Sequence, residues 1–122
     1  MQHCFIVDDS DIIRRFTRLI FENLDFRVSE AENPANAIER LKTDSPDIIL
    51  VDWRIPGANM FEFISLVRKM PLSSRPTIIY MPTENDEADI QRATSAGADT
   101  YLLKPFNTEI VQMKLQDLKS AA

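Results

Sequence analysis

Five short apolar runs alternate with five longer segments of helical periodicity along the 122 residues, and this alternation constrains the fold more than any other feature. Their length and composition are typical of strands buried on both faces of a parallel sheet. The runs are His3–Val7, a short segment near Phe26–Val28, Asp47–Val51, Thr77–Met81 and Tyr101–Leu103. Because parallel strands need crossover helices, the alternation predicts an α/β fold with one parallel sheet and helices on both faces.

Helix-capping residues separate most of the runs. Ser10 or Asp9 can cap the first helix, Asn33 followed by Pro34 can open the second, and Asn107 can cap the last. Gly97 suits the end of the fourth helix, which is expected from about Asn85. The apolar residues expected along the other helices are Ile13, Phe16, Ile20 and Leu24, then Ala37, Ile38 and Leu41, then Ile64 and Val67, and finally Ile110, Val111, Leu115 and Leu118.

Length and composition exclude several classes of protein. A chain of 122 residues with 44% apolar content predicts a single globular domain over residues 1–122 with no output domain. A single cysteine, Cys4, allows no internal disulfide and fits a cytoplasmic location. No run is long enough to span a bilayer, and the net charge of −5 disfavours nucleic-acid binding.

Candidate site residues, most of them polar, follow four of the expected strands, where ligands bind in folds of this class. Because the carboxyl ends of parallel strands share one edge of a sheet, we expect these side chains to meet there. They are Asp8 and Asp9, then Asp52, then Pro82 and Thr83, and finally Lys104. Three carboxylates in one place repel one another unless a cation lies among them, and Mg²⁺ prefers such hard oxygen ligands. The sequence therefore predicts a Mg²⁺ site at this edge.

Asp52 ends the clearest buried strand and is the best placed of the three acids to act as a nucleophile. A carboxylate nucleophile beside a metal ion and an ammonium group is what phosphoryl transfer to aspartate requires. The ammonium group is expected to come from Lys104. These residues indicate a protein that accepts a phosphoryl group on Asp52.

The same residues, with several others, resemble the receiver domains of two-component response regulators, and in particular the stand-alone chemotaxis regulators. The matching pieces are Asp8-Asp9, Asp52-Trp53 with Pro56, the turn Ala96-Gly97-Ala98-Asp99, and Tyr101 followed by Lys104-Pro105-Phe106. The resemblance implies a flavodoxin-like, doubly wound sheet of five strands in the order 2-1-3-4-5, with five helices.

The resemblance also implies roles for individual residues. Asp8 and Asp9 are similar to the family's acidic metal pair, Asp52 to its phosphoacceptor and Lys104 to the lysine that contacts the phosphoryl group. The backbone carbonyl of Arg54 would complete the metal ligands. The Lys104–Pro105 peptide bond is expected to be cis, as is typical of the family.

This sequence departs from the family pattern at the position of a switch residue. Pro82 stands where the family carries threonine or serine, and it has no hydroxyl for the family's usual coupling to the aromatic residue matched by Tyr101, so switching is expected to be either altered or abolished. We hypothesise that the hydroxyl of Thr83 turns toward the site instead. Met60 replaces a glycine of the family, and the side chain of Arg54 is placed to influence water access to an acyl phosphate.

Three functions are consistent with these residues. The first is a phosphorylation-controlled binding module, not an enzyme, that receives its phosphoryl group from a histidine kinase or phosphotransfer protein and contacts a downstream protein as a monomer or weak dimer. The second is a degenerate receiver that binds partners without phosphorylation. The third is a small Mg²⁺-dependent phosphatase with Asp52 as covalent nucleophile.

Overall fold

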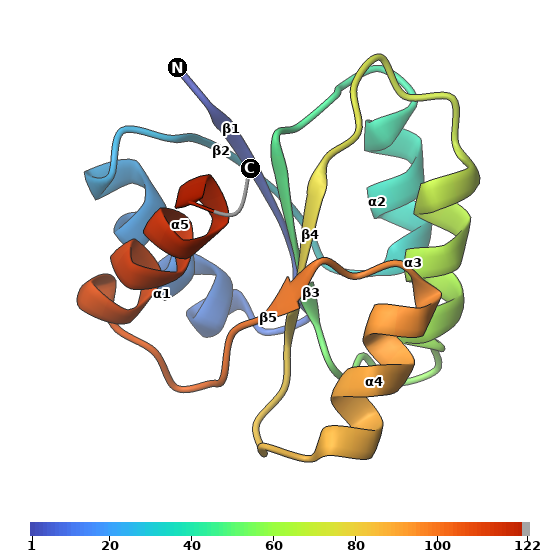
Figure 1. The fold of residues 1–122 in the computed structure, drawn as a ribbon. Helices are drawn as coiled ribbons and strands as arrows, with labels where there is room; N and C mark the ends of the chain where they lie inside the picture. The colour runs from blue at the N-terminus through green and yellow to red at the C-terminus, as the bar shows by residue number, and fades with distance from the viewer. Residues whose placement is uncertain (121–122) are drawn as a thin grey trace.

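A computed structural model describes residues 1–120 and shows the predicted α/β architecture (Figure 1). Five parallel strands form one sheet in the order β2-β1-β3-β4-β5, which confirms the doubly wound topology. The strands are β1 (His3–Val7), β2 (Arg27–Ala31), β3 (Ile48–Asp52), β4 (Thr77–Met81) and β5 (Thr100–Tyr101). The helices are α1 (Asp11–Asn23), α2 (Pro34–Leu41), α3 (Met60–Lys69), α4 (Glu87–Ala96) and α5 (Thr108–Ser120).

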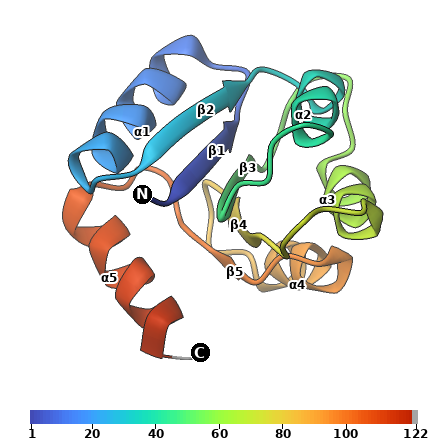
Figure 2. The same cartoon turned by 90° about the horizontal axis from the view of Figure 1, so that it is seen from above.

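The sheet lies between two layers of helices, with α1 and α5 on one face and α2, α3 and α4 on the other (Figures 1 and 2). Side chains alternate between the two faces along each strand. On β1, Phe5 and Val7 pack with α2, α3 and α4, whereas Cys4 and Ile6 pack with α1 and α5. All five residues of β1 and of β3 are buried, as expected for strands covered on both sides.

Most helix ends lie where capping residues predicted them. The hydroxyl of Ser10 accepts a hydrogen bond from the Ile13 amide at 3.2 Å, so Ser10 rather than Asp9 caps α1. The side chain of Asn107 accepts a bond from the Ile110 amide at 2.9 Å at the start of α5. Helix α4 starts two residues later than expected, because Asp86 accepts bonds from two amides of its first turn.

The two edge strands differ from the sequence prediction. β2 starts at Arg27 because the Phe26 amide bonds to the Phe21 carbonyl at 3.0 Å, which assigns Phe26 to the turn that ends α1. β2 then continues to Ala31, beyond the predicted Val28. β5 is shorter than the predicted Tyr101–Leu103 and consists of Thr100 and Tyr101.

The buried face of α1 is also rotated from the one expected. Phe16 is 48% exposed, whereas Thr17, Ile20 and Phe21 are buried. The expectation that Phe16 faces the core with Ile20 was therefore wrong. Thr17 and Phe21 are one helical turn apart, so they share the face that meets the sheet.

Two further features bear on sequence-based expectations. Cys4 is a free thiol and is fully buried, and its burial raises the pKa of the thiol.

Within residues 1–120, no helix combines the length and apolar character needed to cross a membrane.

Candidate functional site

The carboxyl ends of β1 and β3 bring three carboxylates together, as the order of residues predicted. Asp8 follows β1 directly, and Asp52 is the last residue of β3. Asp8, Asp9 and Asp52 each place one carboxylate oxygen within 4.8 Å of the others. Asp8 is 1% and Asp52 4% exposed, whereas Asp9 is exposed. The group is open to solvent on the side of Asp9.

Lys104 joins the two buried acids. Its Nζ atom lies 2.8 Å from Asp8 Oδ2 and 2.8 Å from Asp52 Oδ1, although the three residues are far apart in the sequence. Lys104 follows β5 and its backbone amide donates to the Pro82 carbonyl at 2.8 Å. The Lys104–Pro105 peptide bond is cis, as expected. The two bonds from Nζ hold the ammonium group between Asp8 and Asp52.

Backbone amides orient the carboxylates, and these contacts were not predicted from sequence. The Ser10 amide donates to Asp8 Oδ1 at 2.9 Å, and the Trp53 amide donates to Asp52 Oδ1 at 3.0 Å. Both hydrogen bonds described for the Asp52 side chain, from Lys104 and Trp53, are accepted by Oδ1. Within the described part of the chain, Asp52 Oδ2 is thus the oxygen left available to an incoming group.

Burial and neighbouring charges control the ionisation of this site. Burial raises the pKa of Asp52, the bond from Lys104 acts against that shift, and the charge of Asp8 adds to it. Burial alone would lower the pKa of Lys104, but its bonds to Asp52 and Asp8 outweigh that effect and raise it. Lys104 is therefore a cation at neutral pH.

The net charge of the site can be neutralised by one divalent cation. Three carboxylates and one ammonium group carry a net charge of −2 when ionised, which equals the charge of Mg²⁺ with opposite sign. Oxygen-only ligands at the end of rigid strands are also what Mg²⁺ prefers. The donor set of this site therefore fits Mg²⁺.

Pro82 and Thr83 follow β4, and Tyr101 lies on β5; within residues 1–120, none of the three has a side-chain hydrogen bond to the acidic residues or Lys104. Pro82 is buried, and its carbonyl binds the Lys104 amide, whereas Thr83 is exposed. Tyr101 is half-buried, and the Lys114 ammonium lies over its ring at 5.1 Å from the centroid. The hypothesis that Thr83 takes the place of the missing hydroxyl stays a prediction.

The loop after β3 contains the remaining predicted residues. Trp53 and Arg54 are both exposed and follow Asp52 directly. Met60 is buried at the start of α3, where Asn59 accepts bonds from two amides of the first turn. Metal coordination by the carbonyl of Arg54 stays a prediction. The position of Trp53 makes its indole a natural fluorescence probe of the site.

Comparison with known proteins identifies the family to which this sequence is similar. The family model described as the response regulator receiver domain matches residues 4–116, which is nearly the whole chain. Among curated proteins, the chain is 35% identical over 116 residues to the KDP operon transcriptional regulatory protein KdpE of Escherichia coli, covering 95% of this chain and 50% of KdpE. It thus spans about half the length of that relative.

Other relatives match over most of their length. The chain is 31% identical over 113 residues to the chemotaxis protein CheY1 of Helicobacter pylori, covering 91% of each protein. The solved structure of the chemotaxis protein CheY4 of Vibrio cholerae superimposes with a TM-score of 0.89 at 28% identity, covering 96% of this chain and 98% of CheY4. Both the sequence and the fold are therefore similar to those of small chemotaxis regulators.

Proposed function

The chain belongs to the response regulator receiver family of two-component signalling, and we propose that it accepts a phosphoryl group on Asp52 with Mg²⁺ bound beside it. The observation that carries this proposal is the position of Lys104, whose ammonium group bonds to both Asp8 and Asp52 at 2.8 Å. A buried carboxylate that shares a lysine with a second acid has a positive charge beside it, which stabilises an arriving anionic group.

Asp52 supplies the nucleophile in this proposal. Its Oδ2 atom forms a bond to the phosphorus of a phosphohistidine while the bond from that phosphorus to the imidazole nitrogen breaks. The electron pair stays on the imidazole, which takes up a proton. The Lys104 ammonium, already 2.8 Å from Asp52 Oδ1, neutralises charge on the transferred phosphoryl oxygens.

Asp8, Asp9 and Asp52 would hold Mg²⁺ through their carboxylates, together with the backbone carbonyl of Arg54. The bound ion would supply positive charge against the phosphoryl oxygens. This chain's own contribution is to keep Asp8 and Asp52 buried and oriented by the amides of Ser10 and Trp53.

The phosphoryl donor in this proposal is a histidine kinase or a histidine phosphotransfer protein, and the output is contact with a downstream protein. Residues 1–122 form one receiver domain in this proposal, which acts in the cytoplasm as a monomer or weak dimer. It does not bind nucleic acid or turn over an external substrate. Support comes from the chemotaxis protein CheY1 of Helicobacter pylori, which the chain matches over 91% of its length.

The test is the intact mass of the protein after incubation with a small-molecule phosphodonor, with and without Mg²⁺. We expect the wild type to gain one phosphoryl group only with Mg²⁺, and Asp52→Asn to gain none. Folded wild type that gains no mass, with rapid hydrolysis excluded by sampling at short times, would contradict the proposal and favour a receiver that acts without phosphorylation. Sustained release of phosphate from a generic phosphate ester would instead indicate a phosphatase.

A further inference from the structure

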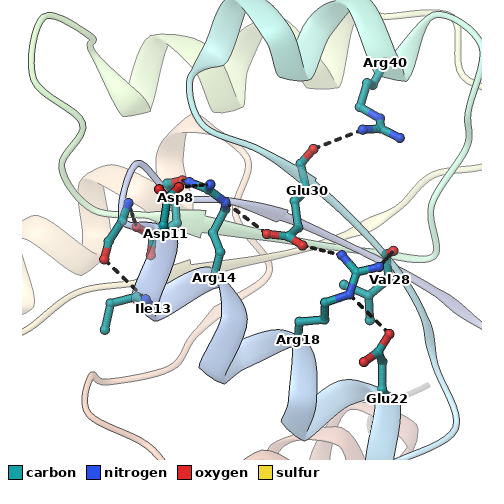
Figure 3. Close-up of polar contacts among 10 residues, drawn as sticks. Asp8, Asp11, Ile13, Arg14, Arg18, Glu22, Val28, Glu30 and Arg40 are labelled. Atoms are coloured by element: carbon teal, nitrogen blue, oxygen red, sulfur yellow. Dashed lines mark hydrogen bonds and ion pairs between the residues drawn. The ribbon is translucent and has the colours of Figure 1, made fainter.

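Arg14 of α1 makes contacts to three different parts of the chain around the acidic site (Figure 3). Its Nη1 atom donates to the backbone carbonyl of Asp8 at 2.7 Å, and its Nε atom donates to Glu30 Oε1 at 3.0 Å. Its Nη2 atom bonds to the carboxylate of Asp11. The Arg14 side chain is 13% exposed, and its bonds to Asp8 and Glu30 are partly buried, whereas the bond to Asp11 lies at the surface.

The carbonyl of Asp8 belongs to the peptide group that joins Asp8 to Asp9. A bond to this carbonyl fixes the plane of the peptide, and with it the direction in which the Asp9 side chain leaves the backbone. On the other side of Asp8, its amide donates to the Ala31 carbonyl of β2 at 3.1 Å. The sheet therefore fixes the amide of Asp8, and Arg14 fixes its carbonyl.

Glu30 of β2 holds Arg14 in place. Its carboxylate accepts bonds from both Arg14 and Arg18, and its backbone carbonyl accepts one from Arg40 at 3.3 Å (Figure 3). Arg18 also donates to the Val28 carbonyl at 3.1 Å. The two arginines thus share Glu30 as a partner, but the contact to Asp8 is made by Arg14.

We propose that Arg14 is a positioning residue for the metal site: it holds the Asp8–Asp9 peptide so that both carboxylates face the cation together with Asp52. This inference rests on the proposed function, because it concerns the Mg²⁺ site described there. Arg14 itself does not contact the metal ion or the phosphoryl group. Partners that orient metal ligands commonly change metal affinity by an order of magnitude or more.

Charge alone predicts the opposite effect, which makes the inference testable. A guanidinium close to the acidic group repels Mg²⁺, so removing its charge would strengthen metal binding if electrostatics were its only influence. Removing a group that positions two ligands weakens metal binding. The sign of the change therefore separates the two roles.

The experiment is a Mg²⁺ titration of folded protein, followed by Trp53 fluorescence and by calorimetry. We expect Arg14→Ala to raise the Mg²⁺ Kd on the order of tenfold. The matched control is Arg18→Ala, which also removes one positive charge and one partner of Glu30 but leaves the bond to Asp8 intact. Its Kd should stay within about twofold of the wild-type value, or fall.

Arg14→Lys provides a second variant that keeps the positive charge. A single ammonium cannot bond to Asp8, Glu30 and Asp11 in the fork geometry of arginine, so its Kd should also rise. If Arg14→Ala fails to fold, as judged by circular dichroism, Arg14→Lys decides the question. A Mg²⁺ Kd for the folded Arg14 variants equal to or below that of the wild type would overturn the inference alone. A wild type that binds no Mg²⁺ would overturn both the inference and the proposed function.

Discussion

Asp52 illustrates at the residue scale how a functional group opposes stability. Its carboxylate is buried beside Asp8, and the pKa of Asp52 is raised first by burial and then by that neighbouring charge. In the folded protein the carboxylate therefore takes up a proton at higher pH than it does in the unfolded chain. Stability from this group is greatest at low pH and is lost as pH rises through the folded pKa.

Asp52→Asn should therefore raise the free energy of unfolding at pH 7 when Mg²⁺ is absent. The neutral amide is close to the carboxylate in size, and it removes one of three mutually repelling charges while Lys104 keeps Asp8 as a partner. Thermal unfolding in the presence of a chelator measures the effect. An unchanged or lower melting temperature would show that the bond to Lys104 outweighs the cost of burial.

The only histidine of the chain allows a second test of burial at the residue scale. His3 is buried on β1, and its Nε2 atom contacts the Ser29 hydroxyl. Burial lowers the pKa of His3 below its usual 6.5, and Asp44, 3.7 Å from Nδ1, acts in the opposite direction. Smaller contributions come from Arg27, Asp47 and Arg40.

The His3 imidazole should titrate below pH 6.5 in an NMR titration of its Cε1 proton, which gives one resonance because no other histidine is present. Just below pH 6.5, the unfolded chain then binds more protons than the folded chain. The free energy of unfolding should therefore decrease as pH falls through this range, and His3→Gln should lose that component. A midpoint at or above 6.5 would contradict the prediction.

At the scale of elements, α4 contributes a single buried side chain to the core. Ala93 is the buried residue of this helix. Another contact is made from β4, where the buried hydroxyl of Tyr80 donates to Asp89 at 3.0 Å. The ring of Tyr80 also packs against Phe61 of α3, with centroids 5.8 Å apart. Tyr80 thus joins α4 to the strand that precedes Pro82.

Tyr80→Phe should lower the free energy of unfolding by about 1.5 kcal/mol, because the bond lost is to a charged group. The loss should be concentrated in α4, where amide hydrogen exchange should become faster than in α3. Tyr101→Phe is the matched control, since it removes a hydroxyl from a half-buried ring on the neighbouring strand. Equal exchange rates in α4 of the wild type and Tyr80→Phe would show that the helix does not depend on this bond.

The turn between α4 and β5 depends on glycine. Gly97 has φ of +129°, and a Cβ atom added there would lie 2.6 Å from Cγ of Arg68. Arg68 is itself held by bonds to the Gly97 carbonyl at 2.9 Å and to Asp99 at 2.7 Å. Any larger residue therefore meets both backbone strain and an anchored side chain.

Gly97→Ala should destabilise the protein by about 2 kcal/mol or more, from strain and overlap together. Gly57→Ala, with φ of +80° and open space around the added carbon, should cost about 1 kcal/mol from strain alone. Denaturant titrations of the two variants compare the costs directly. A smaller loss for Gly97→Ala than for Gly57→Ala would show that Arg68 moves aside easily.

At the scale of the whole molecule, the order of elements and the position of the acids were predictable, but the rotation and length of elements were not. Asp8, Asp52 and Lys104 each follow a run of apolar residues, so the sheet topology alone brings them to one edge. The exposed position of Phe16 was missed because Thr17 takes the core position in its place. Helical spacing alone does not choose between these two neighbouring faces.

Local sequence spacing also does not predict the contacts that complete the site. The bond from Arg14 to the Asp8 carbonyl depends on the rotation of α1 about its axis, which packing of Thr17, Ile20 and Phe21 determines. The short β5 was overpredicted because Leu102 is buried and its amide bonds to the Tyr80 carbonyl, although it lies outside the strand. Such details depend on tertiary packing that no local pattern contains.

The proposed binding of Mg²⁺ at the acidic site would link metal binding to the folding of the whole domain. A ligand that binds only the folded state raises the free energy of unfolding, by about 2.7 kcal/mol when its free concentration is about 100 times Kd. Mg²⁺ should therefore raise the melting temperature of the wild type in proportion to the logarithm of its concentration above Kd.

Asp9→Asn separates this linkage from the intrinsic stability of the fold. Because Asp9 is exposed, its replacement should change the stability of the metal-free protein by no more than about 0.5 kcal/mol. The increase in melting temperature with Mg²⁺ should nevertheless largely disappear, since one of the three proposed carboxylate ligands is lost. Thermal unfolding of both proteins across a Mg²⁺ series, at constant ionic strength, measures the difference. An equal increase in the two proteins would mean that the cation binds elsewhere on the domain, and that Asp9 is only a solvent-exposed neighbour of Asp8 and Asp52.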